Sequence, residues 1–525
     1  MRSPSLQSAL IALPLLVACA QPSLPADAAA ENLRAAPADL DAAPPLALAP
    51  GQAAELTINA DGHLAERLAT PAGNERFALI LASTHFRLGA PASRYELGFA
   101  LAPRTGPNQL LSGCSMTSDR FAKGSLPMDP PPSGPAPKEG NTRSIHVPTH
   151  DGSTTIQAQA LSVGEHAVIW ADTTNPTTLD RAFVAQFRDD FERVILPRAR
   201  QVFGTEPDLD ANGRIQLVFT RLTREHGVAF FSACDLLGTA AGCAASTNQG
   251  EYLYLTPPDA IAPPYNTPNA IKEILAHEVA HLLHFQRKVL RNHLGSWEDG
   301  LYLSEGIGAL AQDVVGYQAG NLYVTQAALG AIDQVSLSDI LLGEQPDHSR
   351  EGALRGGGYL FVRYLYDRAG GDAANGIDIE NRGGPALLRA LLDAPAWVSE
   401  VLPAVSGATV ADLALDFYTA LALSNREDSP SPGAVAADNS CFRFLPTTLD
   451  PMTQKQRGAN VFARFHGSQM EGPRLVEGRS APVGELRAGG VKYLAFDATV
   501  GAPEMPISLQ LDPNALPRVR IARLR

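Results

Sequence analysis

The sequence Ala-His-Glu-Val-Ala-His at residues 276–281 decides the fold and chemistry expected of this chain, and it lies in an apolar, helix-periodic run from about residue 268 to 290. Histidines four residues apart on a helix lie one turn above each other on one face. The ring nitrogens of His277 and His281 can therefore converge on one zinc ion. Glu278 lies about 100° further round the helix, where it can reach a metal-bound water rather than the metal. We expect His277 and His281 to be metal ligands and Glu278 to be the general base.

The helix around this motif has recognisable ends. Thr267 provides a hydroxyl at the N-cap and Pro268 suits the first helical position, while residues 291–295 end the helix. A second helix is predicted to begin near Ser304 and to run to Gly316. Further helices are predicted at residues 359–369, 385–392 and 410–424.

The third protein ligand that a catalytic zinc requires must come from another element. The metzincin pattern would place a histidine six residues after His281, where Arg287 stands, so that class is excluded. Glu305 is favoured, since the residues between it and His281 suffice for a helix–loop–helix turn. The rivals Glu298 and Asp299 lie in a predicted loop, where a ligand is harder to hold rigidly.

A family resemblance extends beyond the motif. It is carried by Phe285–Leu290, Leu303–Gly306 and Leu310–Asp313 after the motif, by Val163–Trp170 and Asn212–Ile215 before it, and by Gly358–Leu365. Over roughly residues 155–425 the chain resembles the hyicolysin-type family of gluzincin metallopeptidases. The resemblance implies a thermolysin-like zincin catalytic domain, built from a small sheet and active-site helices.

The chain also departs from that pattern. The acid that thermolysin-type enzymes carry four residues after the ligand glutamate is absent, because Ala309 stands there. Asp313 is our candidate for orienting a ligand histidine instead, since a metal-bound histidine usually needs a hydrogen-bond acceptor behind it. Tyr359 and Arg355 are candidates for assisting the oxyanion.

Length and charge restrict the possible partners. A chain of 525 residues holds two to four domains, and a net charge of −13 with a pI near 5.4 argues against nucleic acid, whose binding needs a basic surface. Protein or peptide substrates remain.

The N-terminus carries targeting signals. Arg2 and the apolar run at residues 9–17 predict a signal peptide at residues 1–18. The run ends in Leu16-Val17-Ala18-Cys19, which resembles a bacterial lipobox. Lipidation of Cys19 would make the chain an exported bacterial lipoprotein of the cell envelope, anchored to a membrane without spanning it. The alternative is an ordinary secretory signal and a secreted protein.

Four cysteines remain, an even number that in an exported chain predicts two disulfides. Cys234 and Cys243 bracket a short loop and are expected to pair, which leaves Cys114 with Cys441. Three connectivities are possible in principle.

Composition divides the chain into segments of an overall α+β protein, in which small β domains flank the catalytic domain. We predict a flexible tether at residues 19–50, an N-terminal β domain at 51–123, a Pro-rich linker at 124–142, a zinc metallopeptidase domain at 143–440 and a C-terminal β domain at 455–525. Whether residues 51–123 are a removable pro-region is left open.

Residues 208–213, Asp-Leu-Asp-Ala-Asn-Gly, imitate the start of a calcium-binding loop. The acid expected at loop position 12 is missing, because Phe219 stands there. A polar turn before a strand at residues 215–219 is therefore the prediction.

The leading hypothesis is a zinc-dependent endopeptidase. A non-catalytic surface lipoprotein that uses the fold for binding or adhesion is the alternative from another class, and an aminopeptidase is the alternative among enzymes. An aminopeptidase would need an acidic site for the substrate's free amine, and no Gly-rich exopeptidase strand motif precedes the helix.

Overall fold

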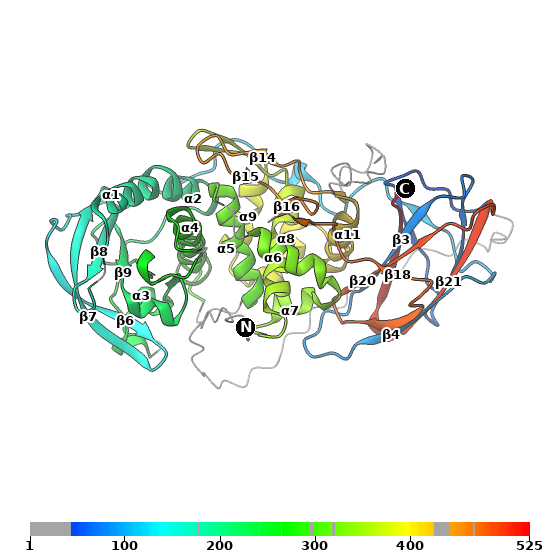
Figure 1. Ribbon diagram of the computed structural model, residues 1–525, viewed down its shortest axis with the longest axis horizontal. Coiled ribbons are helices and arrows are strands. Elements are labelled where there is room, and N and C mark those ends of the chain that lie inside the picture. Colours follow the sequence, from blue (N-terminus) through cyan, green and yellow to red (C-terminus); the bar gives the residue numbers. More distant parts are fainter. Residues whose placement is uncertain are drawn as a thin grey trace.

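The protein is a mixed α+β structure in which a sheet, a group of helices and a β-sandwich follow one another along the long axis of a computed structural model (Figure 1). The described residues are 44–176, 178–240, 242–263, 265–294, 299–317, 321–424, 442–465 and 468–525. The α+β class predicted from the sequence is confirmed.

The first part is a six-stranded sheet with the order β10-β11-β9-β8-β7-β6. Its strands are β6 (Thr142–Thr149), β7 (Gly152–Val163), β8 (Ala167–Asp172), β9 (Ile215–Phe219), β10 (Ala229–Phe231) and β11 (Tyr252–Leu255). The central strands β8, β9 and β11 run parallel and are buried throughout. Ile169 packs into the main core on one face, while Trp170 packs into a smaller cluster on the other. Buried parallel strands of this kind require cover on both faces.

The helix that carries the His-Glu-Val-Ala-His motif lies against this sheet. Helix α4 (Pro268–Phe285) packs on β10 and β11 and continues into the π-helical turn η6 (Gln286–Leu290). The Thr267 hydroxyl accepts a hydrogen bond from the Ala270 N–H at 3.3 Å, as its N-cap position predicts.

Helix α5 (Leu301–Val315) packs beside α4 and begins earlier than the predicted Ser304. Further helices are α1 (Arg181–Asp190), α2 (Leu196–Phe203), α3 (Ala233–Leu237), α6 (Asn321–Gly330), α7 (Leu337–Leu342), α8 (Glu351–Arg368), α9 (Gly384–Asp393), α10 (Val398–Ser406) and α11 (Val410–Leu423). Among the described residues no single helix is long and apolar enough to span a bilayer; α10 and α11 pass that test only as a pair bent by 82°.

Two glycines let α5 and α8 approach closely. A Cβ atom at Gly306 would lie 2.5 Å from the backbone carbonyl of Gly358 on α8, and a Cβ at Gly358 would overlap the carbonyl oxygen of Tyr302 on α5. This close approach brings the N-terminal half of α8 beside Glu305.

The third part is a β-sandwich made from both ends of the chain. One sheet has the order β18-β20-β3-β22-β1-β5 and the other β19-β4-β21-β2. The N-terminal strands are β1 (Ala53–Leu56), β2 (His63–Ala69), β3 (Arg76–Ser83), β4 (Ser93–Gly98) and β5 (Gln109–Leu110). The C-terminal strands are β18 (Val476–Glu477), β19 (Val483–Leu486), β20 (Val491–Asp497), β21 (Glu504–Leu511) and β22 (Pro517–Arg523).

The prediction of separate β domains at residues 51–123 and 455–525 is therefore wrong. β3 lies between β20 and β22, and both sheets contribute to one hydrophobic core. In Figure 1 blue and red strands lie side by side. Removal of residues 51–123 would take an interior strand out of the sandwich, which argues against a removable pro-region.

Two predicted segment boundaries also shift. Leu48 is buried in the sandwich core and Leu46 pairs with Leu68, so the end of the predicted tether is already folded onto β2. Residues 442–465 pack on the helices, where Asp450 forms a buried ion pair with Arg198 at 2.7 Å. The short strand pairs β14 (Thr448–Leu449) with β15 (Gln456–Arg457) and β16 (Arg464–Phe465) with β17 (Ser468–Gln469) lie in this region, and β12 (Asp372–Asn375) pairs with β13 (Asp378–Asn381).

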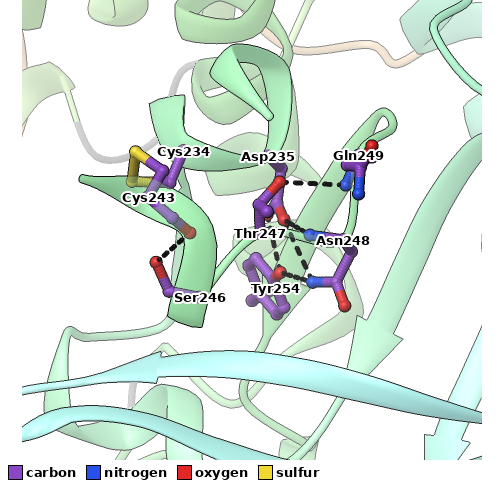
Figure 2. The surroundings of a disulfide bond; sticks show 8 residues. All are labelled: Cys234, Asp235, Cys243, Ser246, Thr247, Asn248, Gln249 and Tyr254. Carbon is purple, nitrogen blue, oxygen red and sulfur yellow. Dashed lines mark hydrogen bonds between the residues drawn. A yellow bond between two sulfur atoms is a disulfide. The ribbon is translucent and has the colours of Figure 1, made fainter. Parts of the chain in front are cut away.

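The predicted disulfide between Cys234 and Cys243 is present, with a Cα–Cα distance of 5.1 Å. Figure 2 shows it beside Asp235, whose carboxylate accepts hydrogen bonds from Tyr254 Oη at 2.7 Å and from the Asn248 N–H at 2.7 Å. The disulfide thus closes the loop that carries this buried carboxylate. Cys114 is also disulfide-bonded, and its predicted partner Cys441 lies outside the described residues.

Candidate metal centre

The two motif histidines lie on one face of α4, as their spacing predicts. Their ring centroids are 4.6 Å apart, and each side chain is only slightly exposed, His277 at 14% and His281 at 13%. Because α4 packs its apolar face on the sheet, the positions of both rings are fixed relative to the sheet.

Glu305 is the acid that meets them. Its Oε2 lies 3.2 Å from His277 Nε2, and its Oε1 lies 3.8 Å from His281 Nε2. Because α5 begins at Leu301, Glu305 is in the second turn of the helix, where its backbone is fixed by hydrogen bonds. The predicted ligands His277, His281 and Glu305 are thus brought together.

The rival Asp299 serves another role. Its carboxylate lies 2.9 Å from His284 Nε2 and accepts the Val398 N–H at 2.7 Å, fully buried away from the motif histidines. Glu298 lies outside the described residues.

The side chains behind the ligand histidines were missed by sequence reasoning. His277 Nδ1 lies 3.2 Å from Gln312 Oε1, and His281 Nδ1 lies 3.2 Å from Ser304 Oγ. Gln312 is held in turn, because its amide donates to Glu273 at 3.1 Å. Such partners fix the ring orientation and the tautomer of a ligand histidine.

Asp313, predicted for that role, does not perform it. It accepts hydrogen bonds from Tyr359 Oη at 3.1 Å, Arg363 Nη1 at 2.9 Å and the Gly458 N–H at 2.8 Å. One residue along a helix turns the side chain by about 100°. Asp313 therefore faces α8 and residue 458, while Gln312 faces the histidines.

The same contacts exclude Tyr359 as an oxyanion-assisting group. Its hydroxyl is bound to Asp313 and its side chain is buried. Arg355, the other candidate, does reach the site: it forms an ion pair with Glu305 and donates to Glu351 at 3.1 Å.

Gly308 makes room for the His277 ring. A Cβ atom at this position would lie 2.6 Å from the His277 ring. Two glycines that follow Glu305 are thus required by packing. Gly306 allows α8 to approach, and Gly308 leaves space for the His277 ring. The spacing of small residues after Glu305 was the signal that could have revealed this.

The predicted base Glu278 is buried beside the ligands. Its Oε2 accepts the Phe231 N–H at 3.0 Å, at the end of strand β10. Burial raises the pKa of Glu278 to about 7. A carboxyl group that titrates near neutrality suits proton transfer.

The protonation states of His281 and Glu305 suit metal binding, whereas the raised pKa of His277 works against it. Burial, and then the neighbouring His277, lower the pKa of His281 to about 3, so this ring is neutral at physiological pH. Burial alone would raise the pKa of Glu305, but Arg355 and then His277 lower it well below its usual range. Burial opposes protonation of His277, yet the contact with Glu305 raises its pKa overall. Neutral imidazoles and a carboxylate are the forms that coordinate zinc.

These residues fit a zinc ion. One ligand atom from each of His277, His281 and Glu305 lies within 4.8 Å of the other two. Zn–N and Zn–O bonds of about 2.0–2.2 Å place the ligands of a tetrahedral site roughly 3–3.6 Å apart. Two imidazoles and one carboxylate, with one position left for a water, form a known catalytic donor set.

Comparison with known proteins adds no assignment: neither the known protein families nor the curated proteins contain a match to this sequence.

Proposed function

We propose that this chain is a zinc-dependent metallopeptidase with a thermolysin-like catalytic part, and that it acts as an endopeptidase. The observation that carries the proposal is the convergence of His277, His281 and Glu305 beside the buried carboxyl of Glu278. The sequence resemblance to the hyicolysin-type gluzincins points in the same direction.

The residues would divide the work as follows. His277, His281 and Glu305 hold the metal, and Gln312 and Ser304 keep the rings oriented. Bound zinc would supply Lewis-acid chemistry, lowering the pKa of a water and polarising a carbonyl. Glu278 takes the proton of the attacking water and passes it to the leaving amine.

The position of β10 supports a peptide as substrate. It is the outermost strand of the described sheet, and Phe231 at its end touches Glu278. An exposed strand edge can pair with an extended peptide through backbone hydrogen bonds. A peptide aligned on β10 would have its backbone beside the base.

Replacement of Glu278 by Gln tests the mechanism. We expect zinc to remain bound and casein hydrolysis to fall by about 10²–10⁴-fold, the usual contribution of a general base. Glu344→Gln, an exposed change outside the site, is the matched control for expression and assay. Unchanged hydrolysis by a zinc-loaded Glu278→Gln protein would refute the mechanism.

Metal analysis and substrate choice separate this function from the alternatives. A wild-type protein that takes up no stoichiometric zinc would favour the non-catalytic, binding or adhesion function. Cleavage of peptides with free N-termini, and none of the same peptides after acetylation, would favour an aminopeptidase.

We also propose an exported, envelope-anchored location through lipid on Cys19, which lies outside the described residues. Mass spectrometry of the mature N-terminal peptide tests this: a diacylglyceryl mass on a peptide beginning at Cys19 is expected. An unmodified N-terminus would instead indicate an ordinary secretory signal.

A further inference from the structure

A second cluster of ligand-type side chains lies at the N-terminal ends of the parallel strands β9 and β11. Asp208, Asp210 and Glu251 each place a carboxylate oxygen within 4.8 Å of the other two. Asp208 and Asp210 belong to the loop before β9, and Glu251 directly precedes β11. No described histidine or cysteine joins this group, so its donors are oxygen alone.

Each carboxylate is held in place by the backbone. Asp208 Oδ1 accepts the Gly213 N–H at 3.0 Å, and Glu251 Oε1 accepts the Leu209 N–H at 2.8 Å. Asp210 Oδ1 accepts the Asn212 N–H at 3.3 Å. The loop therefore does not have to reorganise to bring the three carboxylates together.

The decisive observation is the second oxygen of Glu251. This side chain is 1% exposed, and its Oε2 has no hydrogen-bond partner in the described part of the protein. A buried carboxylate oxygen without a partner is costly, and beside two further carboxylates the cost rises. A cation between the three carboxylates would remove both penalties.

The cation whose charge acts on Asp210 does not fill this role. Arg143 lies over the rings of Trp170 and Tyr252, at 5.6 and 5.7 Å from their centroids. Although its charge acts on Asp210, the contacts described for Arg143 are with aromatic rings. Burial, and then Asp210 and Asp208, raise the pKa of Glu251 to about 8, although the Leu209 N–H opposes the rise.

We propose that Asp208, Asp210 and Glu251 form a structural calcium site. Calcium takes oxygen ligands at about 2.3–2.6 Å, so two ligands on opposite sides of one ion lie up to about 5 Å apart. The Asp-x-Asp-x-Asn-Gly spacing at residues 208–213 matches the opening of a calcium loop. The acid missing at Phe219 is replaced in space by Glu251 from the neighbouring strand.

The site would join elements that are distant in sequence. β9 and β11 are parallel neighbours, and the ion would tie the loop before one to the residue before the other. The Pro-rich linker packs on the loop that precedes β9. The Gly134 carbonyl accepts a hydrogen bond from Arg214 Nη1 at 2.9 Å, and the Asp129 carbonyl accepts one from Thr205 Oγ1 at 2.9 Å. Calcium would therefore also protect residues 129–134 from proteolysis.

Equilibrium dialysis of the full chain against ⁴⁵Ca²⁺ tests the proposal. Near-stoichiometric binding is expected at about 1 mM calcium, the range of extracellular calcium modules. Glu251→Gln and Asp210→Asn should each lose it. Glu305→Gln should keep it, which separates this site from the proposed zinc centre, and Asp235→Asn is the matched control for a buried carboxylate that the protein itself satisfies.

Thermal unfolding gives an independent readout. Calcium should raise the midpoint of the wild type by at least about 3 °C and should leave that of Glu251→Gln unchanged. If Glu251→Gln does not fold, Asp208→Asn, at a half-buried position, provides the same comparison. Absence of calcium binding at about 5 mM, retention of binding in these variants, or preferential binding of Mg²⁺ would each overturn the proposal.

Discussion

The sheet and its helices are built from one continuous stretch of chain, residues 142–424, whereas the sandwich is closed by strands from the two ends. In the sheet of the first region each strand pairs with its neighbour in sequence or lies one crossover away. In the second, Ser83 Oγ donates to the Ala515 carbonyl across 432 positions of sequence. Local patterns therefore specify the first region, while only tertiary pairing specifies the second.

The two regions are not independent. Helix α11 packs on β3 and β22, and Arg520 of the sandwich forms a buried ion pair with Asp416 of α11 at 2.7 Å. Damage to the sandwich is thus expected to reach α11 before it reaches the metal centre.

The largest expected effect comes from deletion of residues 1–123, which removes β1–β5. Without β3 between them, β20 and β22 have no common partner, so the whole sandwich should lose its structure. Hydrogen exchange should show Val491–Asp497 and Pro517–Arg523 unprotected. Persistent protection of both strands would mean that the C-terminal strands form a domain of their own. The sandwich would then not depend on pairing between the two ends of the chain.

A smaller effect is expected at the junction of α5 with residue 458. Asp313→Ala should lower the free energy of unfolding by about 1–3 kcal/mol, because Arg363 loses one buried carboxylate partner while it keeps Asp367. Zinc affinity should change little, since Asp313 faces away from the histidines. Denaturant unfolding and zinc titration measure the two quantities.

Gln312→Ala is the matched control on the neighbouring position. It should lower zinc affinity by about 10–100-fold while changing stability less than Asp313→Ala. The opposite ranking of the two variants would restore Asp313 to the role that the sequence suggested.

The smallest effects distinguish the two regions by pH. Burial raises the pKa of Asp235 in helix α3 to about 7, so the folded state binds the carboxyl proton of Asp235 more tightly than the unfolded state does. Its contribution to stability falls as pH rises from about 4 to 7, by about 1 kcal/mol between pH 6 and pH 8. Asp235→Asn should remove that slope.

Glu75 in the sandwich has the opposite sign. Burial alone would raise its pKa, but the N–H groups of Ala72 and Asn74 lower it overall. Its contribution is present above pH 4.5 and is lost as the pH falls through the lower folded value. The three tryptophans lie at positions 170 to 397, so tryptophan fluorescence reports unfolding of the first region, and hydrogen exchange reports that of the sandwich. An equal dependence of stability on pH in both regions would contradict the opposite signs expected for Asp235 and Glu75.

Sequence reasoning succeeded where a pattern acts within a few turns. The Thr267-Pro268 start predicted the beginning of α4, and the helical spacing of the histidines predicted their shared face. The position of Glu305 beside the two histidines was predictable because a helix–loop–helix turn is itself a short-range structure. The pairing of Cys234 with Cys243 closes a short loop and was predictable for the same reason.

Sequence reasoning failed where a side chain's contacts depend on a rotation of one residue around a helix or on a partner distant in sequence. Asp313 was chosen by residue type, yet the 100° step between adjacent helical positions places Gln312 behind His277. Glu251 was not connected with Asp208 and Asp210, because the register of β9 with β11 brings it there. No local pattern could have placed β3 between β20 and β22.

The closure of the sandwich has a consequence for the order of folding. Gly51 N–H donates to the Arg523 carbonyl at 2.7 Å and β1 pairs with β22, so the first strand of the sandwich closes onto a strand of the C-terminal part. During synthesis β3, whose partners β20 and β22 both come from the C-terminal part, must wait unpaired until the intervening chain has emerged. Exposed strand edges of this kind are prone to aggregation, which gives a newly made chain a need for a holding partner. Because residues 51 and 523 are adjacent, the sandwich is suited to circular permutation: joining these positions and opening the chain in the linker at residues 124–142 would make every strand of the sandwich contiguous in synthesis.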